Sequence, residues 1–184
     1  GYVTYTPRIL GEFGEDHCPS LRFVVNNDNR AKMLQVLYSA LDDVAKKPYV
    51  QKNNIGIIGF SLGAILIRDA GEVKDLKSAG GLQFKYTIPV YGSCTLLERR
   101  GDNVPTLIIQ AEKEKPKKRK LCLRVRNRDF PNVIYHEIAG AYHAFDDPKF
   151  SEIKIDVAGN KMKYNEEAVT KAKNLIENFI KSQN

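Results

Sequence analysis

The chain has 184 residues, of which 29 are Lys or Arg and 22 are Asp or Glu, so its formal net charge at pH 7 is +7. Apolar residues make up 42% and aromatic residues 9%, proportions that are typical of a folded domain and exclude a wholly disordered chain. The longest apolar runs span only a few residues, so we expect no membrane-spanning helix and no membrane partner.

The first third of the chain predicts two strands separated by a loop and a helix. Residues 2–5 are β-branched or aromatic, which favours a short strand. A loop rich in Gly, Asp, Asn and Pro follows to about residue 29. From 30 to 47 apolar residues recur at helical spacing, and Pro48 ends that helix. Residues 55–60 form an apolar run broken only by glycines, which predicts a strand buried on both faces.

The remaining elements alternate in the same way. Short apolar runs at 84–91, 106–111 and 133–138 predict three further strands. Residues 166–180 place their apolar side chains on one face, which predicts an amphipathic helix. Strands alternating with helices predict an α/β domain with a parallel sheet and helices on both faces. No linker or repeat divides the sequence, so we expect residues 1–184 to form a single domain.

The basic segment 113–128 lies between two predicted strands and is expected to be helical at least in part. It holds nine basic residues and one acid, and outside it the chain has 20 basic and 21 acidic residues, a net charge of −1. Three interpretations are open: a solvated helix face, a polyanion-binding patch and a nuclear-import-type signal. Because the segment has no aromatic residue for stacking on bases, we favour the helix face and expect no nucleic-acid partner. Its lysines after Glu114 also suggest a preference for acidic substrates.

A Gly-x-Ser-x-Gly motif, Gly59 to Gly63, follows the apolar run at 55–60 and precedes a short apolar helix. The bare motif is common by chance, and its alternative interpretation is a tight turn in which Ser61 caps the helix. A strand before it and a helix after it are the context that a nucleophile at a sharp turn requires. We expect that a side chain at position 59 or 63 would collide with the backbone of this turn, which explains the two glycines. The backbone N–H of Leu62 would then donate to an oxyanion.

A serine nucleophile needs a histidine and an acid later in the chain. Among the three histidines, His17 precedes the serine and His136 lies within a predicted strand, whereas His143 lies in a loop after the last predicted strand. The acid should follow the strand 106–111. The candidates are Glu112 and Glu114, since Asp102 lies too early in the chain.

With these features the sequence resembles the dienelactone hydrolase family of α/β-hydrolases over essentially its whole length. The matching segments include Asn54-Ile-Gly-Ile-Ile-Gly-Phe-Ser-Leu-Gly63, Tyr91-Gly-Ser-Cys94, Val104-Pro-Thr-Leu-Ile-Ile109 and Gly140-Ala-Tyr-His-Ala-Phe-Asp146. The resemblance implies an α/β-hydrolase fold in which Ser61 is the nucleophile, His143 the general base and then acid, and a carboxylate after the strand 106–111 the third member. Its members hydrolyse esters, lactones or related carbonyl compounds without a cofactor.

Two departures from this family bear on the triad acid and on the extent of the fold. The family usually has Gly-Glu-Lys-Asp-Asp where this chain has Ala111-Glu-Lys-Glu114-Lys, so Glu114 takes the place of the triad aspartate. The chain also begins at what resembles the third or fourth strand of the fold. We therefore expect an N-terminally incomplete domain, a fragment of a longer one, whose open sheet edge is covered by a missing N-terminal segment or by a partner chain.

The functional hypothesis is a serine hydrolase that cleaves a small-molecule ester or lactone through Ser61, His143 and Glu114. The alternative is a catalytically degenerate α/β-hydrolase that acts as a binding or interaction protein.

The three cysteines Cys18, Cys94 and Cys122 show no metal-binding spacing, so we expect no metal, and the resemblance implies no cofactor. Cys94 and Cys122 occupy positions where similar proteins often carry cysteines, and we expect two buried free thiols there, with a disulfide only in an oxidising compartment. No signal peptide is visible, which predicts a cytoplasmic location, or a periplasmic or secreted one if an upstream signal is missing.

Overall fold

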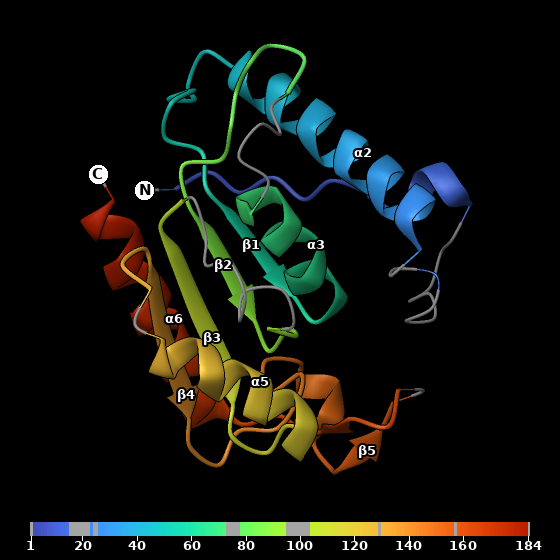
Figure 1. The fold of residues 1–184 in the computed structure, drawn as a ribbon, viewed down its shortest axis with the longest axis vertical. Helices are drawn as coiled ribbons and strands as arrows, with labels where there is room; N and C mark the ends of the chain where they lie inside the picture. The colour runs from blue at the N-terminus through green and yellow to red at the C-terminus, as the bar shows by residue number, and fades with distance from the viewer. Residues whose placement is uncertain are drawn as a thin grey trace.

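The computed structural model describes residues 2–14, 23, 26–72, 78–94, 104–128, 130–156 and 158–183 (Figure 1). Its elements in chain order are η1 (Gly11–Phe13), α2 (Asn27–Ala45), β1 (Ile57–Phe60), α3 (Leu62–Glu72), β2 (Thr87–Val90), β3 (Thr106–Ala111), α5 (Pro116–Asn127), β4 (Val133–Ile138), η2 (Pro148–Phe150), β5 (Lys154–Ile155), β6 (Lys161–Met162) and α6 (Glu166–Ser182). Within these residues no helix is long and apolar enough to cross a membrane.

Four parallel strands form the central sheet in the order β1-β2-β3-β4. The strands start level with one another, because Ile57 is in register with Thr87, Thr87 with Thr106, and Thr106 with Val133. Their carboxyl ends therefore meet at one edge, where the loops that carry functional side chains lie in open α/β sheets. A separate antiparallel hairpin joins β5 and β6. The α/β class predicted from the sequence is confirmed.

Helices cover both faces of the sheet, as predicted. On one face α6 packs against buried residues of β2 and β3, among them Ile88 and Ile109. On the other face Ile57 packs with α2, and Ile108 packs with Val125 of α5. Figure 1 shows α2 and α3 in front of the sheet and α6 behind it. Helix α6 begins where expected because the Asn165 side chain accepts a hydrogen bond from the backbone N–H of Ala168.

Strand β1 is less buried than the sequence suggested. It is an edge strand of the four-stranded sheet, and its residues Ile58 and Phe60 are 39% and 45% exposed. Their partners in register on β2, Ile88 and Val90, are fully buried under α6. The expectation of burial on both faces was wrong because an apolar run does not reveal where its strand lies in the sheet. That a missing segment or a partner chain covers this edge stays a prediction.

The strand predicted for residues 2–5 is also wrong, since residues 2–8 form no strand. Tyr2, Val3 and Tyr5 are 56%, 69% and 58% exposed. High strand propensity is insufficient without a neighbouring strand to supply ladder hydrogen bonds and a packed face. The helix predicted for 30–47 is present as α2 but starts earlier, because the Asn26 side chain caps it by accepting from the N–H of Asn29.

Candidate active site

Ser61 lies at the turn between β1 and α3, at the carboxyl edge of the sheet. Its φ of 51° is in the left-handed region, where residues other than glycine are rare and strained. The turn is fixed on both sides: the N–H of Ser61 donates to the carbonyl of Val90, and the Ser61 carbonyl accepts from the N–H of Ile65. A strained, partly buried serine between a strand and a helix has the geometry expected of a nucleophile turn.

The two glycines of the motif have different roles. A Cβ on Gly59 would lie 2.6 Å from the backbone carbonyl of Gly63, so a side chain at Gly59 would collide with the helix. A Cβ on Gly63 would meet nothing within 4 Å. The expected steric need for glycine is therefore present at Gly59 and absent at Gly63. A second close approach, not predicted from sequence, is Gly92, whose added Cβ would lie 2.6 Å from the Cβ of Ala64.

His143 reaches the serine from a loop after β4. Its backbone is held by Lys161 and Lys163: the His143 N–H donates to the Lys161 carbonyl, and the His143 carbonyl accepts from the Lys163 N–H. The side chain is nearly inaccessible, and Nε2 lies 2.8 Å from Oγ of Ser61. With the ring proton on Nδ1, Nε2 can accept the hydrogen of the serine hydroxyl.

Glu114 completes a continuous chain of contacts. It lies in the turn between β3 and α5, and its Oε1 is 2.6 Å from Nδ1 of His143. The carboxylate side chain has no exposed surface. Of the two acids that the sequence left as candidates, the structure therefore brings Glu114 to the histidine.

Glu112 has a different position and different partners. It accepts a hydrogen bond from the N–H of Gly140 at 2.8 Å and forms an ion pair with Lys113. Gly140 is a left-handed residue of the turn that precedes the histidine loop. Glu112 thus supports the start of that loop and has no described contact with His143 itself.

Lys118 is a member of this site that the sequence analysis did not identify as one. It is the third residue of α5, four residues after Glu114, and its Nζ lies 3.0 Å from Oε1 of Glu114. The same ammonium donates to the carbonyl of Tyr91 at 2.7 Å. The signal in the sequence was the spacing of four between an acid and a lysine at a helix start. Because the Lys118 ammonium is paired with the Glu114 carboxylate, it is less suited to the suggested role of attracting acidic substrates.

The charges in this cluster influence one another. Burial works to raise the pKa of Glu114, but the hydrogen bond from His143 and the charge of Lys118 outweigh it and hold the pKa of this carboxyl below its usual range. Burial lowers the pKa of Lys118, and the Glu114 carboxylate opposes that shift. Glu114 is therefore an anion at neutral pH.

Tyr91 supports the histidine from the end of β2. Its ring meets the imidazole edge to face, with centroids 4.8 Å apart, and its hydroxyl donates to Asp146 at 2.6 Å. Burial, followed by the hydrogen bond to Asp146, raises the pKa of this hydroxyl far above its usual range, so it remains a donor. The tyrosine thereby links the loop after β2 to the histidine loop.

A disulfide joins Cys94 to Cys122, contrary to the expected free thiols. The loop after β2 and helix α5 bring the two Cα atoms to 5.0 Å, within the range that a disulfide spans. The error arose because the sequence does not state the distance between residues 28 positions apart. The cytoplasmic location, expected because no signal peptide is visible, stays a prediction. Buried Gln110 supports the same junction, donating to the Gly92 carbonyl.

Of the other residues considered from sequence, His136 and Leu62 are among those that the structure describes. His136 lies exposed on the edge strand β4, in register with Ile109, as an ordinary strand residue. His17, Cys18 and Asp102 lie outside the described residues. Leu62 begins α3, so its N–H is in the first helical turn and has no acceptor within the helix. The described part of the chain holds no cluster of His, Cys, Asp and Glu suited to a metal.

The parallel sheet, its flanking helices and the serine turn after β1 define an α/β-hydrolase fold. The chain belongs to the dienelactone hydrolase family, whose family model matches residues 1–183. A search among curated proteins found no match.

Solved structures of similar fold agree with this assignment. A dienelactone hydrolase-like promiscuous phosphotriesterase from metagenomic libraries has a TM-score of 0.59 at 16% identity, covering 88% of this chain and 64% of the other. A protein named m3DLH has a TM-score of 0.59 at 15% identity, covering 95% and 65%. An α/β-hydrolase from a Medee basin deep-sea metagenome library has a TM-score of 0.54 at 14% identity, covering 92% and 67%. The chain thus spans about two thirds of the length of these structures.

Proposed function

We propose that the protein is a serine hydrolase of the dienelactone hydrolase type, which cleaves a small-molecule ester or lactone through an acyl-enzyme. The observation that carries this proposal is the unbroken line of contacts from Ser61 Oγ through His143 to Glu114, 2.8 Å and 2.6 Å in length. A structural serine capping a helix would not need a buried histidine and a buried carboxylate aligned behind it.

In the first half of the reaction, Ser61 Oγ attacks the substrate carbonyl while His143 Nε2 takes its proton. The resulting imidazolium is stabilised by the Glu114 carboxylate at Nδ1. Negative charge develops on the carbonyl oxygen, and the N–H of Leu62 at the start of α3 is the proposed donor to it. His143 then returns the proton to the leaving alkoxide, which leaves an ester on Ser61.

In the second half, His143 removes a proton from a water molecule that attacks the acyl-enzyme. Collapse of the tetrahedral intermediate breaks the bond to Ser61 Oγ, which regains a proton from His143. The products are a carboxylic acid and the free enzyme. For a lactone, the alcohol and the acid are parts of one molecule.

Labelling by a fluorophosphonate probe tests the proposal. We expect stoichiometric labelling of the folded protein at Ser61, with loss of labelling in Ser61→Ala and in His143→Ala. Ser151→Ala is the matched control, since Ser151 is exposed and lies outside the contacts described above. Folded protein that stays unlabelled at a high probe concentration would instead support the degenerate, non-catalytic alternative.

Hydrolysis of p-nitrophenyl acetate, an activated ester, provides the second readout. We expect turnover that Ser61→Ala abolishes. Labelling without turnover would mean that acylation occurs and deacylation does not, which would separate the two halves of the proposed mechanism.

A further inference from the structure

One buried oxygen receives two donors in this site. Oε1 of Glu114 is 2.6 Å from His143 Nδ1 and 3.0 Å from Lys118 Nζ, and the two nitrogens are themselves 3.4 Å apart. The other carboxylate oxygen, Oε2, is buried without a hydrogen-bond partner among the described residues. The carboxylate is therefore oriented by the histidine and the lysine together.

The lysine is held in place independently of the acid. Its ammonium donates to the Tyr91 carbonyl at 2.7 Å, and only 18% of its side chain is exposed. One turn further along α5, Cys122 is bonded to Cys94 in the loop that follows Tyr91. Because α5 and this loop are covalently joined so close to the contact, the ammonium and the Tyr91 carbonyl are kept together.

A fixed ammonium next to the imidazole has an electrostatic consequence. His143 must become positively charged when it takes the serine proton, and a positive charge 3.4 Å from Nδ1 disfavours that form. Neutral imidazole is the form that can act as a base. The lysine therefore opposes the charged form of the histidine, whereas the Glu114 carboxylate favours it.

The other charged groups around this cluster come from neighbouring segments. Lys115 precedes α5 and Asp156 follows β5. The charge of Asp156 raises the pKa of Lys118, and the charge of Lys115 lowers it. Asp146 accepts the hydrogen bond of the Tyr91 hydroxyl, and the negative charges of Asp146 and Asp147 both raise the pKa of that hydroxyl. Among the described residues, Lys118 and Glu114 are the charged groups in direct contact with the imidazole.

We propose that Lys118 is a positioning residue of the reaction: it fixes Glu114 Oε1 against His143, and its charge opposes the protonated form of the imidazole that the Glu114 carboxylate favours. This inference rests on the proposed roles of Ser61, His143 and Glu114.

The test is an NMR titration of the His143 imidazole in the wild-type protein, in Lys118→Met and in Lys117→Met. His143→Gln identifies the signal among the three histidines. Without the ammonium next to Nδ1, we expect the titration midpoint of His143 to move to higher pH. Lys117→Met, which removes an exposed lysine from the preceding position of the same helix, should leave the midpoint unchanged. A midpoint in Lys118→Met within about 0.3 unit of wild type would overturn the proposal.

Two further variants separate charge from structure. Lys118→Arg keeps a positive charge and should stay near the wild-type midpoint. Lys118→Gln retains an N–H for the Tyr91 carbonyl while removing the charge, so it replaces the Met variant if that variant does not fold. A purely structural role predicts lost stability in Lys118→Gln with no change in midpoint, and that result would also refute the proposal.

The titration needs no substrate, so its outcome is independent of whether the protein hydrolyses esters. A raised midpoint together with absent fluorophosphonate labelling would support the role of Lys118 in setting the histidine and reject the proposed function. Where turnover is measurable, the acid limb of kcat/KM should move to higher pH in Lys118→Met by the same amount.

Discussion

The contact between Glu114 and His143 allows the effect of Glu114→Gln to be worked out from the structure. Lys118 Nζ lies at Oε1, so a glutamine would place its carbonyl oxygen there, because an amide N–H2 would face the ammonium donor. The histidine would then keep its proton on Nδ1 and its orientation. What the substitution removes is the negative charge opposite the imidazolium.

The size of that loss follows from Coulomb's law. Two unit charges about 4 Å apart interact by about 4 kcal/mol at an effective dielectric constant of about 20. At about 1.4 kcal/mol per factor of ten, the loss corresponds to a fall of about 10³ in kcat. We therefore expect Glu114→Gln to hydrolyse p-nitrophenyl acetate about 10³-fold more slowly than wild type.

Glu112→Gln is the matched control. Its amide oxygen can still accept from the Gly140 N–H, and its side chain is 32% exposed, so we expect less than about a threefold loss. Two results would refute the assignment of the acid. One is an equal loss of kcat in Glu112→Gln and Glu114→Gln, and the other is a kcat of Glu114→Gln within tenfold of wild type.

A double variant extends the same reasoning. In Glu114→Gln the ammonium of Lys118 faces the imidazolium with no carboxylate between them. Adding Lys118→Met should therefore recover part of the lost activity, and the coupling between the two substitutions is measured by the double-mutant cycle. If the double variant is slower than Glu114→Gln by the full effect of Lys118→Met alone, the two side chains act independently.

Three other predictions concern the scaffold and pH. Cys94→Ala, Cys122→Ala and the double variant should each lower the free energy of unfolding by about 3.5 kcal/mol, from the loop-closure entropy of a cross-link over 28 residues; a larger loss in the double variant would argue against a disulfide. Gly59→Ala should lose about 1–3 kcal/mol and fluorophosphonate reactivity through its contact with Gly63, whereas Gly63→Ala should be neutral or stabilising in thermal unfolding; equal effects would contradict the geometry. Because the pKa of Glu114 is lowered on folding, its contribution to stability is complete above the ordinary value of 4.5 and is lost as the pH falls through the lowered value; acid unfolding of Glu114→Gln should lack this component, and an unchanged pH dependence would count against it.

Much of the fold could be predicted because local patterns agree with tertiary position in the sheet centre. The predicted strands 106–111 and 133–138 coincide with β3 and β4, since each apolar run is bounded by residues that end a strand. The strand predicted at 2–5 and the two-sided burial predicted for 55–60 were wrong for the opposite reason. Their strand character and burial depend on which strands lie beside them, and that is a long-range property.

The candidate site shows the same division. The Gly-x-Ser-x-Gly turn and His143 could be identified because chain order and neighbouring elements constrain them. Choosing Glu114 over Glu112 needed the resemblance to a family, because the sequence alone does not distinguish two glutamates that lie two residues apart in the same predicted loop. The disulfide and the contact of Lys118 with Tyr91 require distances between separate segments, which no local pattern supplies.

The basic segment 113–128, which accounts for the net charge of the chain, has internal uses for part of that charge. Lys118 pairs with Glu114, and Arg119 forms two hydrogen bonds of 2.7 Å to Glu137 on β4.

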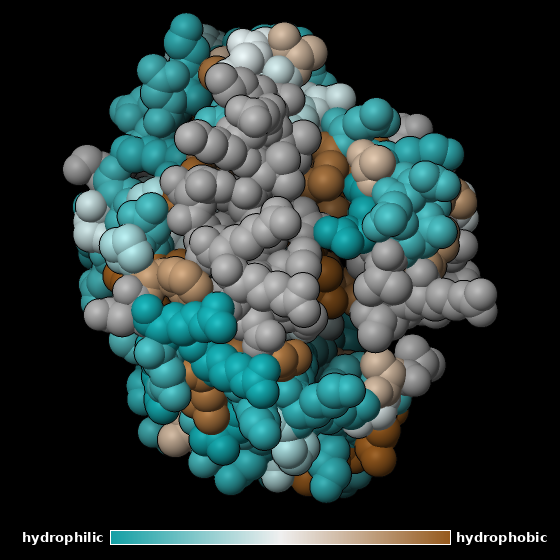
Figure 2. Space-filling model, viewed as in Figure 1, coloured by the Kyte–Doolittle hydropathy of each residue, from teal (hydrophilic) through white to brown (hydrophobic). Residues whose placement is uncertain are grey.

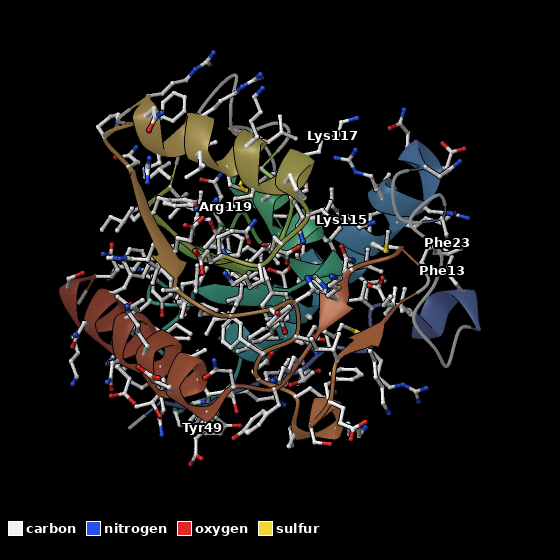
Figure 3. All side chains as sticks on the ribbon, turned by 90° about the horizontal axis from the view of Figure 1, so that it is seen from below. Phe13, Phe23, Tyr49, Lys115, Lys117 and Arg119 are labelled. Atoms are coloured by element: carbon white, nitrogen blue, oxygen red, sulfur yellow. A yellow bond between two sulfur atoms is a disulfide. The ribbon has the colours of Figure 1, made fainter. Side chains whose placement is uncertain are left out.

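The Lys115 ammonium donates to the Ala158 carbonyl, whereas Lys117 points outward from α5 in Figure 3. Figure 2 shows hydrophilic residues over the region of α5.

A polyanion site needs cations that are free to displace counterions, and each internally paired lysine or arginine reduces that number. The placement of these side chains therefore favours a helix that organises the serine–histidine–glutamate site over one that presents its charge to a nucleic acid.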